Sequence, residues 1–421
     1  MGAPGTTLDG TARRAIGSAC EHVDDAAPTD TVDGVRPAVV ARPADVDQTA
    51  EVMRAAASHG LRVVPRGRGT KLSWGMPPTG VDVLLDTSAM DEVLDHAAGD
   101  LIVETQAGTR LADVQAAVGR GGQRLAIDET VPGGSVGGAL AVNVSGPRRL
   151  ATGTARDLLI GITVVRADGL VAKAGGRVVK NVAGYDLGKL MVGSFGTLAV
   201  VTSALFRLHP LPAESRWVSV PVADADDAHE AVQSVLHAQA VPAALEIDWP
   251  ARGTCTVSVL LEGRADGVEG RSASVRSLLG VDATESDQAP ADRATYPWDV
   301  TATADDRATA LKLTFAISAL PEVLRAAQDL GVSLRGSAGT GVVYGALPPD
   351  TPLQAVGAAV DRLRTACGRH GGSLVVVDAP SAVKEAVDVW GPVPAVDLMR
   401  RVKDQFDPQH RLAPGRFVGG I

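Results

Sequence analysis

PRGRGTKLSWG, residues 65–75, is a short stretch in which glycines are interspersed with basic residues. It follows a strand-like apolar run at 61–65, so the chain turns here and brings bare backbone amides together with the charges of Arg66, Arg68 and Lys71. Glycine allows a ligand to approach the backbone closely. The combination predicts a turn that binds a diphosphate.

Two further glycine-dense stretches follow, VPGGSVGGALAVNVSG at 131–146 and GGRVVKNVAGYDLGKLMVGSFGTL at 175–198. One glycine loop alone is equally typical of an ordinary turn or a helix end, but three in series favour a shared ligand site. The common nucleotide fingerprints do not apply. Leu72 stands where a Rossmann motif needs its third glycine, and Val64 stands where a P-loop needs its first.

The order of these stretches resembles the PCMH-type FAD-binding domain of the vanillyl-alcohol oxidase superfamily, over most of residues 35–212 and a smaller C-terminal piece. Within that superfamily, three phrases are similar to the FAD-binding E subunits of bacterial glycolate oxidases. They are the third glycine stretch, VDVWGP at 387–392 and DLMRRVKDQFDPQHRLAPGRF at 397–417.

This resemblance implies an FAD-dependent oxidoreductase subunit that takes part in the oxidation of glycolate or another small 2-hydroxy acid. It also implies two partners, a second flavoprotein subunit and an iron–sulfur subunit. Two alternatives stay open: a stand-alone flavin dehydrogenase or aldonolactone-type oxidase, and a non-catalytic electron-relay or structural subunit.

Composition agrees with a chain of two domains. It has 421 residues, of which 45% are hydrophobic, and 40 basic against 49 acidic side chains give a formal charge of -9. The basic residues are scattered, which argues against nucleic acid as a partner. No apolar segment predicts a signal peptide or a membrane span, so we expect a cytoplasmic protein that reaches a membrane only through partner subunits. Cys20, Cys255 and Cys367 form no CxxC pattern, so the sequence predicts neither an iron–sulfur cluster nor a zinc or other metal site.

Periodicity predicts an α+β fold. An FAD-binding domain at 35–212 has helices at 46–59 and 111–118 and strands at 61–65, 81–86 and 101–106. A cap domain at 213–389 reads strand, helix, strand, strand, helix, then strand, helix, strand, strand, helix, strand, which favours an antiparallel sheet backed by helices. Its candidate strands are 217–222, 254–261, 311–317, 342–347 and 374–377. Residues 390–421 are expected to return to the first domain, and the tail before about Pro37 is expected to be mobile.

The candidate FAD-binding residues come from all three glycine stretches and one segment between the last two. The first stretch is assigned to the pyrophosphate; by resemblance, the second approaches ribose, diphosphate and flavin. An ordinary or buried turn is the alternative for each, and a helix cap or a salt-bridge partner is the alternative for Asp157. The residues are Pro65, Arg66, Gly67, Arg68, Gly69, Thr70, Pro132, Gly133, Gly134, Ser135, Gly137, Gly138, Asn143, Ser145, Gly146, Thr154, Asp157, Lys180, Gly184 and Asp186.

Candidates for catalysis are few. Lys180 is a candidate to stabilise negative charge on a reduced flavin, and pairing with Asp186 to fix its loop is an equal alternative. Arg335 and Tyr344 are candidates for binding a substrate carboxylate. The segment LRGSAGTGVVYG at 334–345 has no histidine where related 2-hydroxy-acid dehydrogenases have several, so the expected base is missing. Because residues 65–75 also contain no histidine, FAD is predicted to bind without a covalent link.

Overall fold

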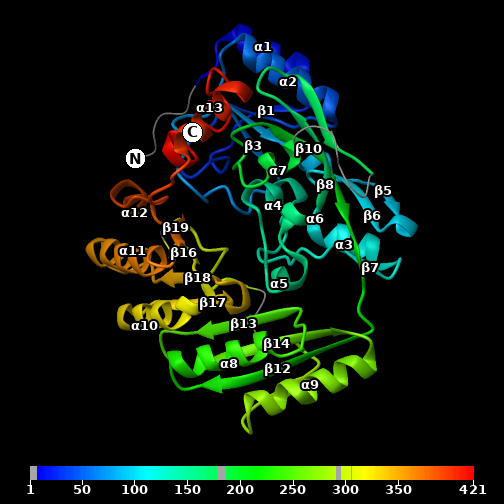
Figure 1. Cartoon of the computed structure of the whole chain (residues 1–421). Coiled ribbons are helices and arrows are strands. Elements are labelled where there is room, and N and C mark those ends of the chain that lie inside the picture. The colour runs from blue at the N-terminus through cyan, green and yellow to red at the C-terminus, as the bar shows by residue number, and fades with distance from the viewer. Residues whose placement is uncertain (1–6, 178–185, 291–294, 305) are drawn as a thin grey trace. The chain divides into compact units, whose positions relative to one another are not determined.

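The computed structural model describes residues 7–177, 186–290, 295–304 and 306–421 (Figure 1). The chain divides into two compact units. Unit 1 contains Met1–Val144, Thr154–Pro210 and Val393–Ile421, and unit 2 contains Ser145–Gly153 and Leu211–Pro392. Residues 145–153, which we expected in the first domain, are thus grouped with unit 2.

Unit 1 has two main sheets. The first has the strand order β1-β2-β4-β3, in which β2, β4 and β3 run parallel and β1 is antiparallel. The second, β5-β6-β10-β8-β9, is antiparallel throughout. The strands are β1 (Val23–Asp25), β2 (Val39–Ala41), β3 (Val63–Arg66), β4 (Val83–Asp86), β5 (Val93–Ala97), β6 (Ile102–Gln106), β8 (Leu159–Val165), β9 (Val171–Gly175) and β10 (Val200–Arg207), with a separate pair β7 (Gln123–Arg124) and β11 (His209–Pro210).

Two helices cover the first sheet. Ile16 of α1 (Gly10–Ala19) and Met53 of α2 (Val46–Ser58) are buried in one cluster with Val39, Val63 and Leu85 of the strands. The predicted mobile tail is therefore wrong over α1 and β1. Asp9 caps α1 by accepting hydrogen bonds from the amides of Thr11 and Ala12. The local sequence gives little signal for this short helix, because the helix buries only Ala12 and Ile16.

A second core surrounds Phe206 of β10 and joins the second sheet to short helices. These helices are α3 (Leu111–Gly119), α4 (Val136–Val142), α6 (Ala155–Leu158) and α7 (Leu187–Met191). The C-terminal helix α13 (Val396–Phe406) contributes Val402 and Phe406 to the same core. Farther along, Leu412 pairs with Val63 of β3, so the end of the chain lies beside the strand that leads into the first glycine stretch.

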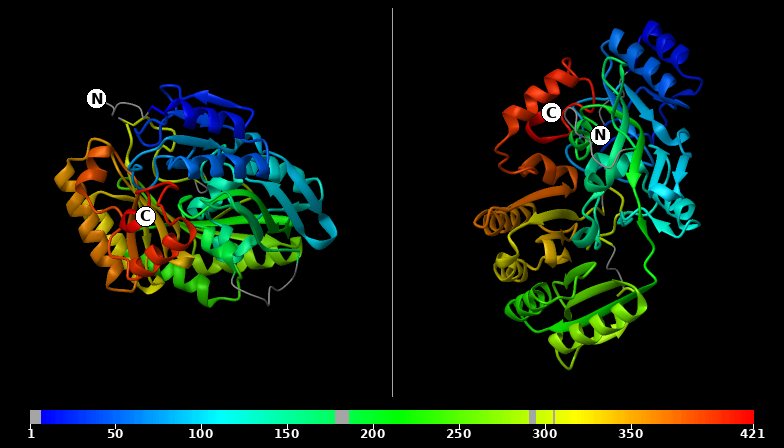
Figure 2. Two further views of the ribbon diagram at one scale, coloured as in Figure 1. Left: turned by 90° about the horizontal axis from the view of Figure 1, so that it is seen from above. Right: turned by 45° about the vertical axis from the view of Figure 1, so that its right-hand side comes forward.

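Unit 2 is built on one antiparallel sheet with the order β15-β12-β14-β13-β17-β18-β16-β19. Helices α9, α8, α10 and α11 contact one another in that order and form a layer on the sheet (Figures 1 and 2). The predicted antiparallel sheet backed by helices is confirmed. The elements are α5 (Arg149–Thr152), β12 (Glu214–Val222), α8 (Ala225–His237), β13 (Ala244–Trp249), β14 (Cys255–Gly263), α9 (Ala265–Leu279), β15 (Thr284–Ser286), β16 (Thr309–Thr314), α10 (Leu320–Leu330), β17 (Ser333–Ser337), β18 (Val342–Leu347), α11 (Leu353–Gly368), β19 (Ser373–Asp378) and α12 (Ser381–Ala386).

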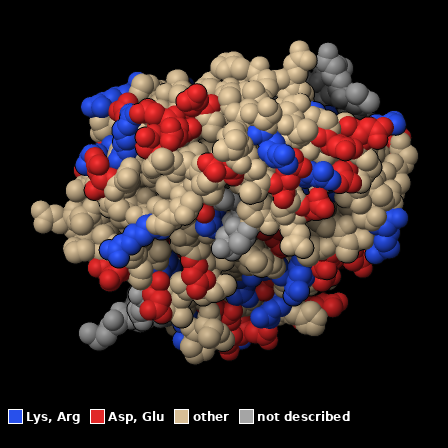
Figure 3. All heavy atoms as spheres, turned by 90° about the horizontal axis from the view of Figure 1, so that it is seen from below, with Lys and Arg blue, Asp and Glu red and all other residues tan. Residues whose placement is uncertain are grey.

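In the part of the chain that the structure describes, no helix is long and apolar enough to cross a bilayer. On the face drawn in Figure 3, acidic and basic side chains are interspersed, and no broad basic patch is seen there.

Candidate functional site

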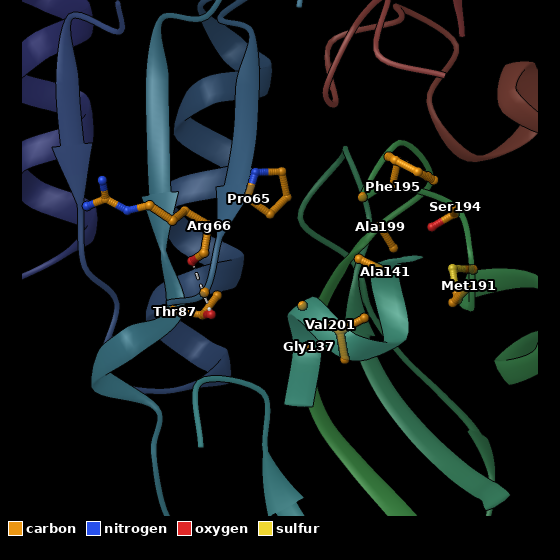
Figure 4. A pocket seen from close by; sticks show the side chains of 13 residues that line it. Pro65, Arg66, Thr87, Gly137, Ala141, Met191, Ser194, Phe195, Ala199 and Val201 are labelled. Atoms are coloured by element: carbon orange, nitrogen blue, oxygen red, sulfur yellow. Dashed lines mark hydrogen bonds between the residues drawn. The ribbon is translucent and has the colours of Figure 1, made fainter. Parts of the chain in front are cut away.

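A groove in unit 1 passes between β3 and the α4 helix. It consists of two adjoining hollows that share several lining residues, among them Gly67, Gly138 and Phe195. Figure 4 shows the first hollow, with Pro65, Arg66 and Thr87 on one side and residues of α4, α7 and β10 on the other. Of the predicted residues, those that line the groove are Pro65, Arg66, Gly67, Arg68, Gly69, Thr70, Ser135, Gly137 and Gly138.

Glycines bring the first two glycine stretches into direct contact. A Cβ atom on Gly67 would lie 2.1 Å from the Ser135 hydroxyl oxygen, so a side chain does not fit there. Ser135 in turn caps α4 by accepting a hydrogen bond from the Gly138 amide at 3.2 Å. Gly69 has a φ of 77°, in the left-handed region that favours glycine. The two stretches therefore form one wall of backbone along the groove.

The two predicted arginines have different surroundings. The Arg66 guanidinium forms ion pairs with Asp30 and Asp86, both at 2.7 Å, and it points away from the labelled residues across the hollow in Figure 4. Arg66 therefore borders the groove mainly through its backbone, whose carbonyl accepts a hydrogen bond from the Thr87 hydroxyl at 3.3 Å. Arg68 donates to the Gly108 carbonyl at 3.1 Å and also pairs with Asp91.

Part of the second stretch is engaged internally. The amides of Gly133 and Gly134 donate to the Glu129 carboxylate at 2.9 and 3.2 Å. The sequence predicts that these two amides bind the cofactor, but in the structure they bind the Glu129 side chain. Pro132 and Gly133 are exposed, and neither lines the groove.

Other predicted residues have local structural contacts outside the groove lining. Thr154 and Asp157 form the capping box of α6, which is the alternative interpretation of Asp157. Asp186 caps α7. Asn143 ends α4 with a φ of 52° and accepts from the Arg156 amide, while Ser145 accepts from Arg149. Gly146 does not line the groove either, and Lys180 and Gly184 lie outside the described residues.

Several groove residues were missed as candidates. Phe195 lines both hollows with a φ of 55°, a strained value for an aromatic residue. Arg416, from the C-terminal segment, donates to the carbonyls of Leu72 and Trp74 at 2.7 Å each and borders the second hollow. The sequence signal for both was their place in quoted family phrases. Lys71, whose charge was assigned to the diphosphate turn, also lines the groove, and the full set missed is Leu72, Thr87, Ala141, Val142, Met191, Ser194, Phe195, Gly196, Ala199, Val201 and Arg416.

Lys71 is the groove residue whose pKa is shifted most clearly. It is partly buried at the second hollow, and its Nζ atom lies 3.3 Å from the Thr70 hydroxyl and 5.9 Å from the centre of the Trp74 ring. Burial lowers the pKa of Lys71 to about 8, and the charge of Glu129 opposes this shift only in part.

The two substrate candidates lie side by side in unit 2. Arg335 of β17 stands opposite Tyr344 of β18, and Asp248 of β13 stands opposite Arg335 on its other side. The Arg335 guanidinium donates to Asp248 at 2.9 Å and to the Thr295 hydroxyl at 3.2 Å. Tyr344 packs edge-on against Tyr296, with ring centres 4.6 Å apart. Both candidates therefore belong to one polar and aromatic row on the sheet.

The three cysteines form no disulfide bonds in the structure. Cys20 and Cys367 are buried, Cys255 is partly buried, and all three are free thiols. Burial raises the pKa of Cys367 to about 12. Within the described ranges, no group of three or more His, Cys, Asp or Glu side chains is placed to hold a metal ion.

Two family models match this chain. Residues 37–175 match the model described as FAD binding domain, and residues 389–417 match the model described as FAD linked oxidases, C-terminal domain. The first match contains both glycine stretches that form the wall of the groove. The prediction of FAD as the cofactor is therefore confirmed.

Curated relatives match over part of their length. The chain is 32% identical over 216 residues to the glycolate oxidase subunit GlcD of Bacillus subtilis, which is 51% of this chain and 46% of that protein. It is 35% identical over 144 residues to the glycolate oxidase subunit GlcE of Escherichia coli, which is 34% of this chain and 38% of that protein. A D-lactate dehydrogenase of Archaeoglobus fulgidus is 33% identical over 208 residues, 49% of this chain and 46% of that protein. The matches thus span about half the length of these relatives or less.

Among solved structures, the 4-ethylphenol oxidase of Gulosibacter chungangensis superposes with a TM-score of 0.72 over 98% of both chains, at 16% sequence identity. At that identity the likeness concerns the fold alone. It extends over both units, and the predicted PCMH-type FAD-binding fold with a second antiparallel domain is confirmed.

Proposed function

We propose that this chain is the FAD-binding subunit of a dehydrogenase for glycolate or another small 2-hydroxy acid, of the E-subunit type. The observation that carries the proposal is the backbone-walled groove, which lies largely within the segment that matches an FAD-binding domain. The partial matches to glycolate oxidase subunits and a D-lactate dehydrogenase support the substrate class.

The groove residues fit a dinucleotide with linked phosphates. Gly67 and Gly69 leave the backbone accessible, Thr70 offers a hydroxyl, and Arg68 and Arg416 supply positive charge at the second hollow. The first hollow is bordered by apolar groups such as Ala141, Met191 and Val201, which suit an aromatic ring system. Bound FAD would supply a centre that accepts a hydride and passes electrons onward.

A carboxylate substrate would be held in unit 2 under this proposal. Arg335 offers a guanidinium fork that suits an anionic carboxylate, and Tyr344 offers a hydroxyl in the same row. Since Arg335 already donates to Asp248 and Thr295, substrate binding would have to replace or share one of these bonds.

Electrons would leave through partner subunits. Because the chain is similar in part to two different glycolate oxidase subunits, GlcD and GlcE, we propose a second flavoprotein subunit and an iron–sulfur subunit as its partners. Cytoplasmic location, with membrane association only through these partners, belongs to the same proposal.

An anaerobic titration tests the proposal. The purified chain, alone and co-expressed with its genomic neighbours, is mixed with glycolate or D-lactate while the visible flavin absorption is followed. We expect bleaching in the co-expressed complex. A colourless chain that takes up no added FAD would refute the proposal.

A non-catalytic electron-relay or structural role is the second candidate. It is favoured by the absence of histidine from residues 334–345 and by the internal pairing of Arg335. Under this alternative, the flavin of this chain stays oxidised when substrate is added to the chain alone, and it is reduced only when an active partner is present. Bleaching of the isolated chain would instead indicate a stand-alone dehydrogenase or oxidase.

A further inference from the structure

Lys312 of β16 stands directly opposite Tyr344 of β18 on the unit 2 sheet (Figure 1). Residues that stand opposite each other on neighbouring strands project to the same face of a sheet, so the row that contains Asp248, Arg335 and Tyr344 continues to Lys312. Leu311, the neighbour of Lys312 in the chain, is fully buried on the other face. The row therefore has one polar side chain on each of four adjacent strands.

Only one of the two cations in this row has a counter-ion. The Arg335 guanidinium pairs with the Asp248 carboxylate at 2.9 Å. Lys312 is partly buried, and its ammonium group has no ion pair and no hydrogen bond among the described residues. Its cross-strand neighbours, Tyr344 and Val375, carry no negative charge. Asp248 lies three strands away, which corresponds to about 14 Å between backbones.

The Tyr344 hydroxyl is a second donor beside Lys312. Within the described ranges it makes no hydrogen bond. The Tyr344 ring packs edge-on against Tyr296, with ring centres 4.6 Å apart, and Trp298 stacks on the far side of this pair at 4.5 Å from Tyr296. Because this packing fixes the ring, the hydroxyl is oriented before any ligand binds.

We propose that Lys312 and the Tyr344 hydroxyl hold the substrate carboxylate, while Arg335 stays paired with Asp248. An ammonium group and a phenol are both hydrogen-bond donors, and a carboxylate accepts such bonds strongly because it is charged. Binding there breaks none of the bonds of Arg335, whereas a carboxylate on Arg335 would compete with Asp248. This inference rests on the proposed function, and it names Lys312, in place of Arg335, as the cation that meets the substrate.

Steady-state kinetics of the FAD-loaded, co-expressed complex test this assignment with glycolate and D-lactate. Lys312→Met should raise KM about 10-fold to 100-fold with kcat nearly unchanged, as expected for a lost charge-assisted hydrogen bond that binds substrate and transition state alike. The inhibition constant of acetate, which carries the carboxylate alone, should rise by the same factor. Tyr344→Phe keeps the ring packing and should raise KM about tenfold. Lys173→Met, at an exposed lysine of β9, is the control and should resemble the wild type.

A double variant compares Lys312 with Arg335. Arg335 and Asp248 neutralise each other, so their joint replacement in Arg335→Met/Asp248→Asn keeps the net charge of the row. This variant should therefore raise KM less than Lys312→Met does. The reverse order would make Arg335 the carboxylate ligand and would overturn the assignment.

The remaining outcomes separate this inference from the proposed function. If the wild-type complex oxidises either substrate and Lys312→Met has a KM within about twofold of it, the role of Lys312 is overturned while the proposed function stands. If Lys312→Met does not fold, an unchanged KM in Tyr344→Phe overturns the inference. A complex that contains FAD but oxidises no small 2-hydroxy acid overturns the proposed function itself.

Discussion

At the scale of single residues, Gly67 has no room for a side chain. Its Cβ would lie 2.1 Å from the Ser135 hydroxyl, and Ser135 is fixed as the cap of α4. We therefore expect Gly67→Ala to push the two glycine stretches apart and to weaken FAD binding by about tenfold or more. Titration of the apoprotein with FAD measures this effect.

Two further variants check this mechanism. Gly119→Ala in α3 adds a methyl group where no atom lies within 4 Å, so it should leave FAD binding unchanged. Ser135→Ala removes the atom at 2.1 Å, so adding it to Gly67→Ala should recover part of the affinity, although losing the cap costs about 1 kcal/mol of stability. Equal affinity in Gly67→Ala and the wild type would show that this contact does not shape the site.

A second residue-scale prediction concerns how FAD is held. Residues 65–75 contain no histidine, so acid precipitation should release the flavin into the supernatant. The colour of the pellet and of the supernatant gives the result. A yellow pellet that resists washing in denaturant would mean a covalent link from another residue.

Sequence reasoning identified the backbone of the site better than its charges. Gly67, Gly69 and Gly138 were predicted and line the groove. They could be predicted because a glycine in a turn lets a ligand approach the backbone closely. Arg66 was a candidate, yet its guanidinium pairs with two aspartates distant in sequence. Lys71 was named for its charge in the diphosphate turn, but its burial could not be predicted, because it depends on Gly134 and Trp74 in the folded chain. Contacts between segments that are distant in the sequence determine which basic side chains are available to bind a ligand.

At the scale of secondary-structure elements, the buried side chain of Lys403 links α13 to the backbone at Thr197 and Leu412. The Lys403 ammonium is fully buried and donates to Asp407 at 2.7 Å and to the carbonyls of Thr197 and Leu412. Lys403→Met leaves Asp407 as an uncompensated buried charge, so the free energy of unfolding should fall by about 3–5 kcal/mol. Urea denaturation measures the change. Gln405→Met, exposed on the same helix, is the control and should change it by less than about 0.5 kcal/mol.

The order of elements was more predictable than their limits. In unit 2 the doubled strand and helix order was confirmed except for β15, which has only three residues. Helix α10 carries buried Leu320, Val323, Leu324 and Ala327 at helical spacing, so its periodicity is clear. Helix α1 buries too few apolar residues to give such a signal. Short elements depend on tertiary contacts, and local patterns do not predict those.

At the scale of the whole molecule, the two units should respond differently to FAD. Every residue that lines the groove belongs to unit 1, including Arg416 from the C-terminal segment. Ligand binding stabilises the structure to which the ligand is bound, and it lowers the rate of local opening there. Hydrogen exchange with and without FAD should therefore show added protection in residues 65–75, 135–142 and 191–201. Helices α8 to α11 of unit 2 should exchange at unchanged rates. Protection confined to residues 211–392 would place the cofactor outside the groove and would contradict this assignment.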